Sequence, residues 1–162
     1  MKVFLIELNL KSNINLTMGV IDLLFNHRKD ILERNLTDGR IFMAENAERE
    51  GVVTLDSGLQ YRVIKEGGGR KPKATDSVKC HYHGANIKGE IFDSSIDRGL
   101  PATFPLDRVI KGWTEGLQLM SEGSKYEFVI PPHLAYGKQK LSKEIGPNST
   151  LIFEVELIEI VG

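Results

Sequence analysis

The pattern of apolar and polar positions changes near Gly51. Before Gly51, apolar residues recur at intervals of three and four, as they do on one face of a helix. Thr17 is a candidate N-cap for a first helix, and Thr37 is a candidate cap for a second helix that ends at Gly51. We therefore predict a helical appendage with a linker helix over residues 1–50, followed by a folded domain over residues 51–162.

Alternation with a period of two follows Gly51 and predicts antiparallel strands separated by turns. The predicted strands cover residues 59–63, 78–84, 91–92, 126–130 and 151–157. Within the second of these, the alternation directs Tyr82 toward the core and His81 and His83 toward the opposite face. The pair Lys88-Gly89 has the composition of a tight turn, and we expect residues 99–105 to form a loop.

A short helix is predicted between the third and fourth strands. Ile110, Trp113, Leu117 and Met120 recur there at helical spacing, and several glycines limit the length of the helix. Its apolar face is expected to lie against the sheet. The predicted fold class is therefore α+β, with an antiparallel sheet wrapped around one short helix and a helical appendage before it.

The charge balance argues against a polyanionic partner. The chain has 21 Lys and Arg residues against 22 Asp and Glu residues, so we expect no nucleic-acid binding. The first apolar run, Val3 to Ile6, is too short for a signal peptide, and no stretch approaches the roughly 20 apolar residues of a membrane span. With Cys80 as its single cysteine, the protein is expected to be soluble and cytoplasmic.

A metal site is the main alternative chemistry that the residues raise. Cys80, His81, His83 and His133 are possible ligands, but the alternation separates Cys80 from the two neighbouring histidines. We therefore expect no metal and no cofactor. The glycines at residues 67–69 lack the Gly-Lys-Ser/Thr ending of a phosphate-binding loop, so a turn that ends a strand explains them better.

Several short segments of the second part resemble the FKBP-type peptidyl-prolyl isomerases. Their order and spacing carry the resemblance, which extends from about Ser57 to Val161. The segments are SGLQY at 57–61, HYHG at 81–84, GEIFDSS at 89–95, VIKGW at 109–113, AYG at 135–137 and LIFEVEL at 151–157. The phrase MAENAEREG at 43–51 resembles the end of the linker helix in bacterial Mip-like members.

The resemblance implies an apolar pocket in which X-Pro peptide bonds rotate. Its catalytic residues would be Tyr82, Phe92, Asp93, Ile110, Trp113, Tyr136 and Phe153, and its further substrate-binding residues Phe104, Val109 and Ile145. Trp113 would form the floor, and Ile145 would lie in a flap. Two departures stand out: Ala102 replaces a pocket phenylalanine of many relatives, and residues 138–144 make the flap unusually charged.

The expected function is that of a prolyl isomerase that assists protein folding. The implied partners are proline-containing unfolded or partly folded proteins, with tacrolimus and rapamycin as inhibitors and a possible homodimer through the N-terminal helices. A scaffold that keeps the fold without turnover is the alternative, and a chaperone role of the appendage is compatible with isomerase activity. The family also has periplasmic members.

Overall fold

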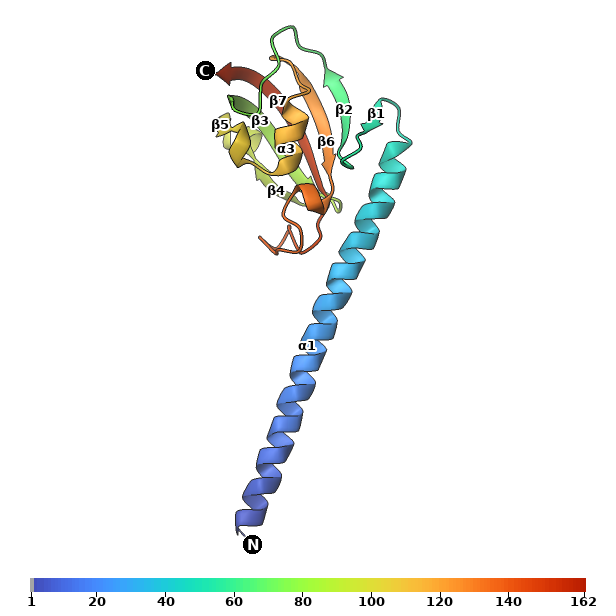
Figure 1. Cartoon of the computed structure of the whole chain (residues 1–162), viewed down its shortest axis with the longest axis vertical. Helices are drawn as coiled ribbons and strands as arrows, with labels where there is room; N and C mark the ends of the chain where they lie inside the picture. Colours follow the sequence, from blue (N-terminus) through green and yellow to red (C-terminus); the bar gives the residue numbers. More distant parts are fainter. Residues whose placement is uncertain (1) are drawn as a thin grey trace. The chain divides into compact units, whose positions relative to one another are not determined.

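The computed structural model describes the backbone of residues 2–162 and the burial of side chains from Thr17 onward. Two compact units make up the chain, Met1–Arg34 and Asn35–Gly162. The first unit is helical throughout its described length. The second contains the sheet, the short helices and the C-terminal turns of the long helix, as Figure 1 shows for its sheet and helix.

One continuous helix, α1 (Lys2–Ala47), replaces the two predicted helices. The prediction of a second start at Thr37 was wrong because the helix continues through Gly39, which is buried against Thr150. An added Cβ at Gly39 would collide with the Thr150 hydroxyl, so a tertiary contact explains this glycine. Gly51 adopts φ 80° beyond the helix, in the left-handed region that the pattern predicted there.

The sheet of the second unit is antiparallel and has the strand order β1-β2-β6-β7-β3-β4, with β5 paired to β3. Its strands are β1 (Val52–Thr54), β2 (Gln60–Lys65), β3 (Ser77–Asn86), β4 (Ile91–Ser94), β5 (Ala102–Pro105), β6 (Lys125–Ile130) and β7 (Leu151–Val161). Buried and half-buried residues alternate along the whole of β3, which confirms the predicted inward face of Tyr82. The central strands β3 and β7 pair along nearly their full length.

The segment predicted as a loop at residues 99–105 contains the strand β5. Phe104 pairs with Val78 and Ala102 pairs with Cys80, so β5 extends the sheet at the start of β3. Pro101 precedes the strand and Pro105 ends it, and these two prolines led us to expect a loop although Ala102 and Phe104 alternate with exposed neighbours. This pairing also fixes the position of Phe104 in the site described below.

The short helix α3 (Lys111–Leu117) lies against β6, as the spacing of its apolar residues predicted. Its glycines do more than limit its length. An added Cβ at Gly112 would come within 2.6 Å of Ile130, and one at Gly116 within 2.6 Å of Phe128. The two glycines therefore allow the helix backbone to approach the sheet closely, which places Trp113 inside the core.

The remaining short elements are α2 (Ser95–Arg98) and two 3-10 turns, η1 (Leu106–Arg108) and η2 (Pro132–Leu134). Ser94 caps α2 by accepting a hydrogen bond from the N–H of Asp97, and Gly99 ends it at φ 72°. The helix α2 follows β4 directly, and it carries Arg98 toward the residues of β3 and β4.

Candidate active site

A pocket of about 540 Å³ opens between the sheet, α3 and the loop between β6 and β7. This volume suits a small ligand or a short peptide segment. All ten residues that the resemblance assigned to the site line it: Tyr82, Phe92, Asp93, Phe104, Val109, Ile110, Trp113, Tyr136, Ile145 and Phe153. The structure therefore brings together residues that are scattered over about seventy positions of the sequence.

Aromatic rings build the floor and walls of the pocket. Trp113, which is 4% exposed, makes edge-to-face contacts with Tyr82, Phe104 and Phe153 at centroid distances of 5.4, 5.4 and 5.3 Å. Phe92 stands against Phe153 in the same manner at 5.4 Å. Edge-to-face packing fixes each ring in one orientation, so the surface offered to a ligand is preformed and apolar.

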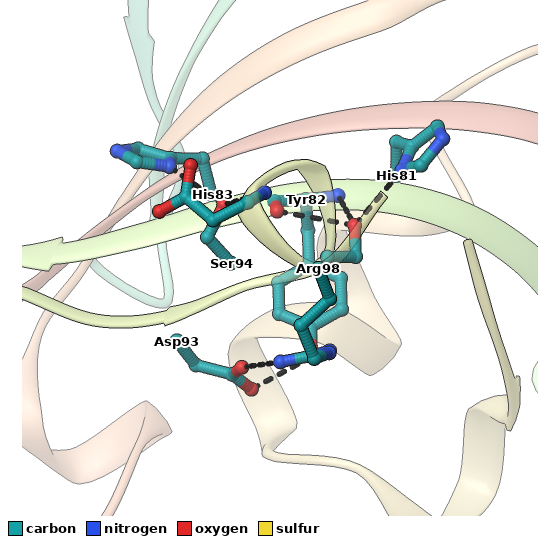
Figure 2. A network of polar contacts seen from close by, with 8 residues as sticks. His81, Tyr82, His83, Asp93, Ser94 and Arg98 are labelled. Carbon is teal, nitrogen blue, oxygen red and sulfur yellow. Dashed lines mark hydrogen bonds and ion pairs between the residues drawn. The ribbon is translucent and has the colours of Figure 1, made fainter. Parts of the chain in front are cut away.

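Three polar side chains form a network at the edge of this aromatic floor. The Tyr82 hydroxyl donates to Asp93 Oδ2 at 2.7 Å, and Arg98 Nη2 donates to the Tyr82 oxygen at 2.7 Å. Arg98 also forms an ion pair with Asp93, as Figure 2 shows. Its guanidinium lies 5.7 Å from the centroid of the Tyr82 ring. Neither Asp93 nor Tyr82 can therefore turn without breaking several contacts.

The electrostatics of the network keep its protonation states fixed near neutral pH. Desolvation by burial raises the pKa of Asp93, but hydrogen bonds from Tyr82 and Arg98 outweigh it, so the pKa of Asp93 lies below its usual value. Desolvation, followed by the hydrogen bond to Asp93, raises the pKa of Tyr82. Asp93 is therefore ionised, and its oxygens are already engaged by Tyr82 and Arg98. This arrangement suits a positioning role better than proton transfer.

Tyr136 faces the pocket from the loop that follows β6. Desolvation by burial, followed by the nearby charge of Asp93, raises the pKa of its hydroxyl. The phenol therefore keeps its proton at neutral pH and can donate a hydrogen bond to an acceptor in the pocket. Ile110 immediately precedes α3, so its backbone N–H lies outside the helix's own hydrogen-bond ladder.

Two serines, one at the end of β4 and one at the start of α2, contact the two histidines of β3. The Ser95 hydroxyl accepts from the Tyr82 N–H at 2.7 Å and lies 3.0 Å from His81 Nδ1. The Ser94 hydroxyl lies 2.9 Å from His83 Nδ1. From Thr17 onward, no group of three or more Cys, His, Asp or Glu side chains is arranged to hold a metal ion. The hydroxyl of Ser95, which also contacts the Tyr82 carbonyl at 3.2 Å, ties the backbone of β3 to the start of α2.

Sequence reasoning missed four residues of the site. Arg108, Leu141 and Ser142 line the pocket, and Arg98 forms part of the polar network. Arg98 lies three positions beyond the matching segment at 89–95, and the one-turn helix that presents it was not predicted. Leu141 and Ser142 lie within the charged flap, where no period indicates which residues face inward. Their proximity to Ile145 was the only available signal.

This antiparallel sheet around a short helix, with an aromatic pocket at its open side, defines the FKBP-type fold. A family model described as FKBP-type peptidyl-prolyl cis-trans isomerase matches residues 68–158. A second, described as the domain amino terminal to that isomerase, matches residues 10–63. The chain therefore belongs to the FKBP-type peptidyl-prolyl isomerase family, and the N-terminal match extends well beyond the motif at 43–51.

Individual relatives agree with the family assignment. The chain is 54% identical over 132 residues to the FKBP-type peptidyl-prolyl cis-trans isomerase FkpA of Aeromonas hydrophila, covering 82% of this chain and 48% of that protein. It is 49% identical over 134 residues to the FKBP-type 22 kDa peptidyl-prolyl cis-trans isomerase of Escherichia coli K12, covering 83% and 65%. The chain thus spans about half to two thirds of the length of these relatives.

Solved structures show the same fold. The crystal structure of FkpA from Escherichia coli superimposes with a TM-score of 0.82 at 39% sequence identity, covering 91% of this chain and 71% of that chain. Among the helices described from Lys2 onward, none combines the length and apolar content that a bilayer-spanning segment requires. The cytoplasmic location stays a prediction.

Proposed function

We propose that the protein is a peptidyl-prolyl cis-trans isomerase that rotates X-Pro bonds in protein substrates and so assists folding. The observation that carries the proposal is the preformed aromatic pocket, in which Trp113 forms the floor and Tyr82, Phe104 and Phe153 stand edge-on around it. A proline ring is apolar and rigid, and it suits a surface of this shape. The family membership of the chain supports the same conclusion.

Desolvation is the proposed main source of catalysis. The uncatalysed rotation has a barrier of about 18–20 kcal/mol because amide resonance is lost at the twisted midpoint. Water stabilises the planar, charge-separated amide, so an apolar pocket that removes water from the imide carbonyl favours the less polar twisted form. Each tenfold gain in rate requires about 1.4 kcal/mol of such differential stabilisation. Neither a covalent intermediate nor a metal ion is required.

Polar groups at the pocket edge would orient the substrate. The Ile110 N–H and the Tyr136 hydroxyl are the proposed donors to substrate carbonyls, and Asp93 orients Tyr82 through their hydrogen bond. The residue before proline would lie against Phe92, Tyr136 and Ile145, which are apolar or aromatic. We therefore propose a preference for substrates with an apolar residue at that position.

Isomerase activity is expected on short peptides in which an apolar residue precedes proline. Cis-to-trans relaxation, which takes tens of seconds near 25 °C without a catalyst, should shorten measurably at micromolar protein because the pocket is preformed. A protease-coupled or NMR exchange assay over several preceding residues measures this. Traces that superimpose on the blank for every peptide would favour the scaffold function instead.

Tacrolimus and rapamycin provide a control for the position of the site. If they occupy the same pocket, they should inhibit isomerisation over the concentration range in which they change the fluorescence of Trp113, the only tryptophan. Inhibition without a fluorescence change would place the active site elsewhere. A proline-limited refolding assay beside the peptide assay tests whether the protein also acts on larger clients.

Self-association through α1 is proposed as the role of the first unit. Several large apolar side chains of this helix are more than half exposed: Met18, Leu23, Leu24 and Phe25. Exposed apolar side chains in such numbers indicate a surface that binds another protein chain. In such a dimer, a client protein bound to one isomerase domain would meet the second domain at a high effective concentration. The molecular mass in solution, measured with and without residues 1–34, tests this proposal.

A further inference from the structure

The last described turns of α1 contact the chain segment that follows the flap. Asn35 Nδ2 donates a hydrogen bond to the Pro147 carbonyl at 2.7 Å, joining residues that are 112 positions apart. An added Cβ on Gly146 would lie 3.3 Å from the same nitrogen, so the Asn35 side chain also lies close to the backbone of Gly146. One turn further along α1, Gly39 is packed against Thr150. The helix therefore holds both ends of residues 146–150.

This segment is connected directly to the pocket. The Asn148 N–H donates to the Gly137 carbonyl at 2.8 Å and closes the base of the flap loop. Within the loop, the Leu141 N–H donates to the Ile145 carbonyl at 2.9 Å. Leu141 and Ile145 both line the pocket, and Ile145 is only two residues from Pro147. Because only one residue separates them in the chain, a shift of Pro147 would also move Ile145.

The flap is also held by the buried side chain of Ile145 and by the Ser142 hydroxyl, which accepts hydrogen bonds from the N–H groups of Glu144 and Ile145. Its lysines at 138, 140 and 143 are exposed, and none forms an ion pair with any residue of the described chain. Asn86 Nδ2 donates to the Glu144 carbonyl at 3.0 Å and supplies a second support from β3. A long charged loop loses much conformational entropy when it is ordered, so each of these supports affects the fraction of molecules with a closed flap.

We propose that Asn35 is a positioning residue of the isomerase site, because it fixes the flap through Pro147. The inference rests on the proposed isomerase function. Asn and Gly are both weak helix formers, and their contacts with residues 146–150 explain why they occupy positions 35 and 39 of a long helix. The pocket therefore depends on a residue outside the predicted domain of residues 51–162.

The test compares Asn35→Ala with Asn26→Ala in the full chain. Both variants make the same change on the same helix, so helix propensity changes equally, but Asn26 is exposed to solvent. Hydrogen exchange is measured at the amides of Leu141 and Asn148, with the amide of Arg62 in β2 as an internal reference. In Asn35→Ala alone, we expect about fivefold faster exchange in the flap and about fivefold lower kcat/KM.

An Asn35→Asp variant separates the hydrogen bond from general loosening of the helix. A protonated carboxyl can donate to the Pro147 carbonyl, whereas a carboxylate cannot. The activity of this variant relative to wild type should therefore rise as pH is lowered from 7 toward 4, through the carboxyl pKa. A flat ratio, or flap exchange equal in Asn35→Ala and Asn26→Ala, overturns the proposal.

The exchange measurement does not depend on turnover. A wild-type protein that exchanges as expected but isomerises no peptide would refute the isomerase function, and with it the role of Asn35 in that reaction. Wild-type activity combined with unchanged flap exchange in Asn35→Ala would refute the positioning role alone. The two failures are therefore distinguishable.

Discussion

Replacing Phe153 with alanine should lower the free energy of unfolding by about 3–5 kcal/mol and reduce isomerase activity to the background rate. Phe153 is 5% exposed and lies in β7, between Phe128 of β6 and Gly84 of β3. Its ring contacts both Trp113 and Phe92, so its removal leaves a cavity beneath the pocket and frees two rings of the wall. Urea denaturation followed by tryptophan fluorescence measures the loss of stability.

Two further variants make this result specific. Leu100 is 70% exposed after α2 and lies outside the pocket, so Leu100→Ala removes an apolar side chain without leaving a cavity and should leave both quantities nearly unchanged. Phe153→Leu keeps an apolar side chain and should fold, yet it lacks the edge-to-face contact with Trp113. A folded Phe153→Leu with full activity would show that the orientation of the rings does not matter for catalysis.

The sequence predicted the sheet well wherever one face of a strand is buried and the other is not. The alternation of β3 and β7 is of this kind, and each strand was predicted within a few residues of its observed bounds. The helix α3 was found because Trp113 and Leu117 recur at helical spacing. In each of these elements, the regular spacing of apolar residues reflects burial of one face. A single sequence was therefore sufficient to predict them.

The errors occurred where a contact distant in sequence overrides the local signal. Thr37 was interpreted as the start of a second helix, but α1 continues through this region, where Gly39 packs against Thr150. The strand β5 has alternation in only four residues, follows Pro101 and ends with Pro105, and its pairing with β3 determines its conformation. Neither the contact of Gly39 with Thr150 nor the pairing of β5 with β3 can be detected from the local spacing of residues.

The pocket residues were found through family resemblance, because periodicity alone would place Phe92 and Phe153 simply in the core. Residues that support the site from outside the matching segments were missed. Arg98 acts through Tyr82 and Asp93, and Asn35 contacts Pro147 from the N-terminal helix. Such supporting contacts depend on the assembled fold, so no short motif contains them.

Replacing Gly84 with alanine should lower isomerase activity by about 10- to 100-fold while the protein remains folded. An added Cβ at Gly84 would lie 2.7 Å from ring atoms of both Phe92 and Phe153. Phe153 is packed against Trp113, whereas Phe92 is only half buried, so Phe92 is expected to move into the pocket. Peptide isomerisation and urea denaturation should be measured on the same samples.

The expected loss of stability for Gly84→Ala is about 1–3 kcal/mol, the usual effect of overpacking, so activity should fall much further than folding. Gly68→Ala is the matched control, because Gly68 is exposed and an added Cβ would meet no atom within 4 Å. If Phe92 is what closes the pocket, the double variant Gly84→Ala with Phe92→Leu should recover part of the activity, since the smaller side chain leaves room for the new methyl group. Full activity in Gly84→Ala alone would mean that the wall formed by Phe92 and Phe153 does not shape the reactive site.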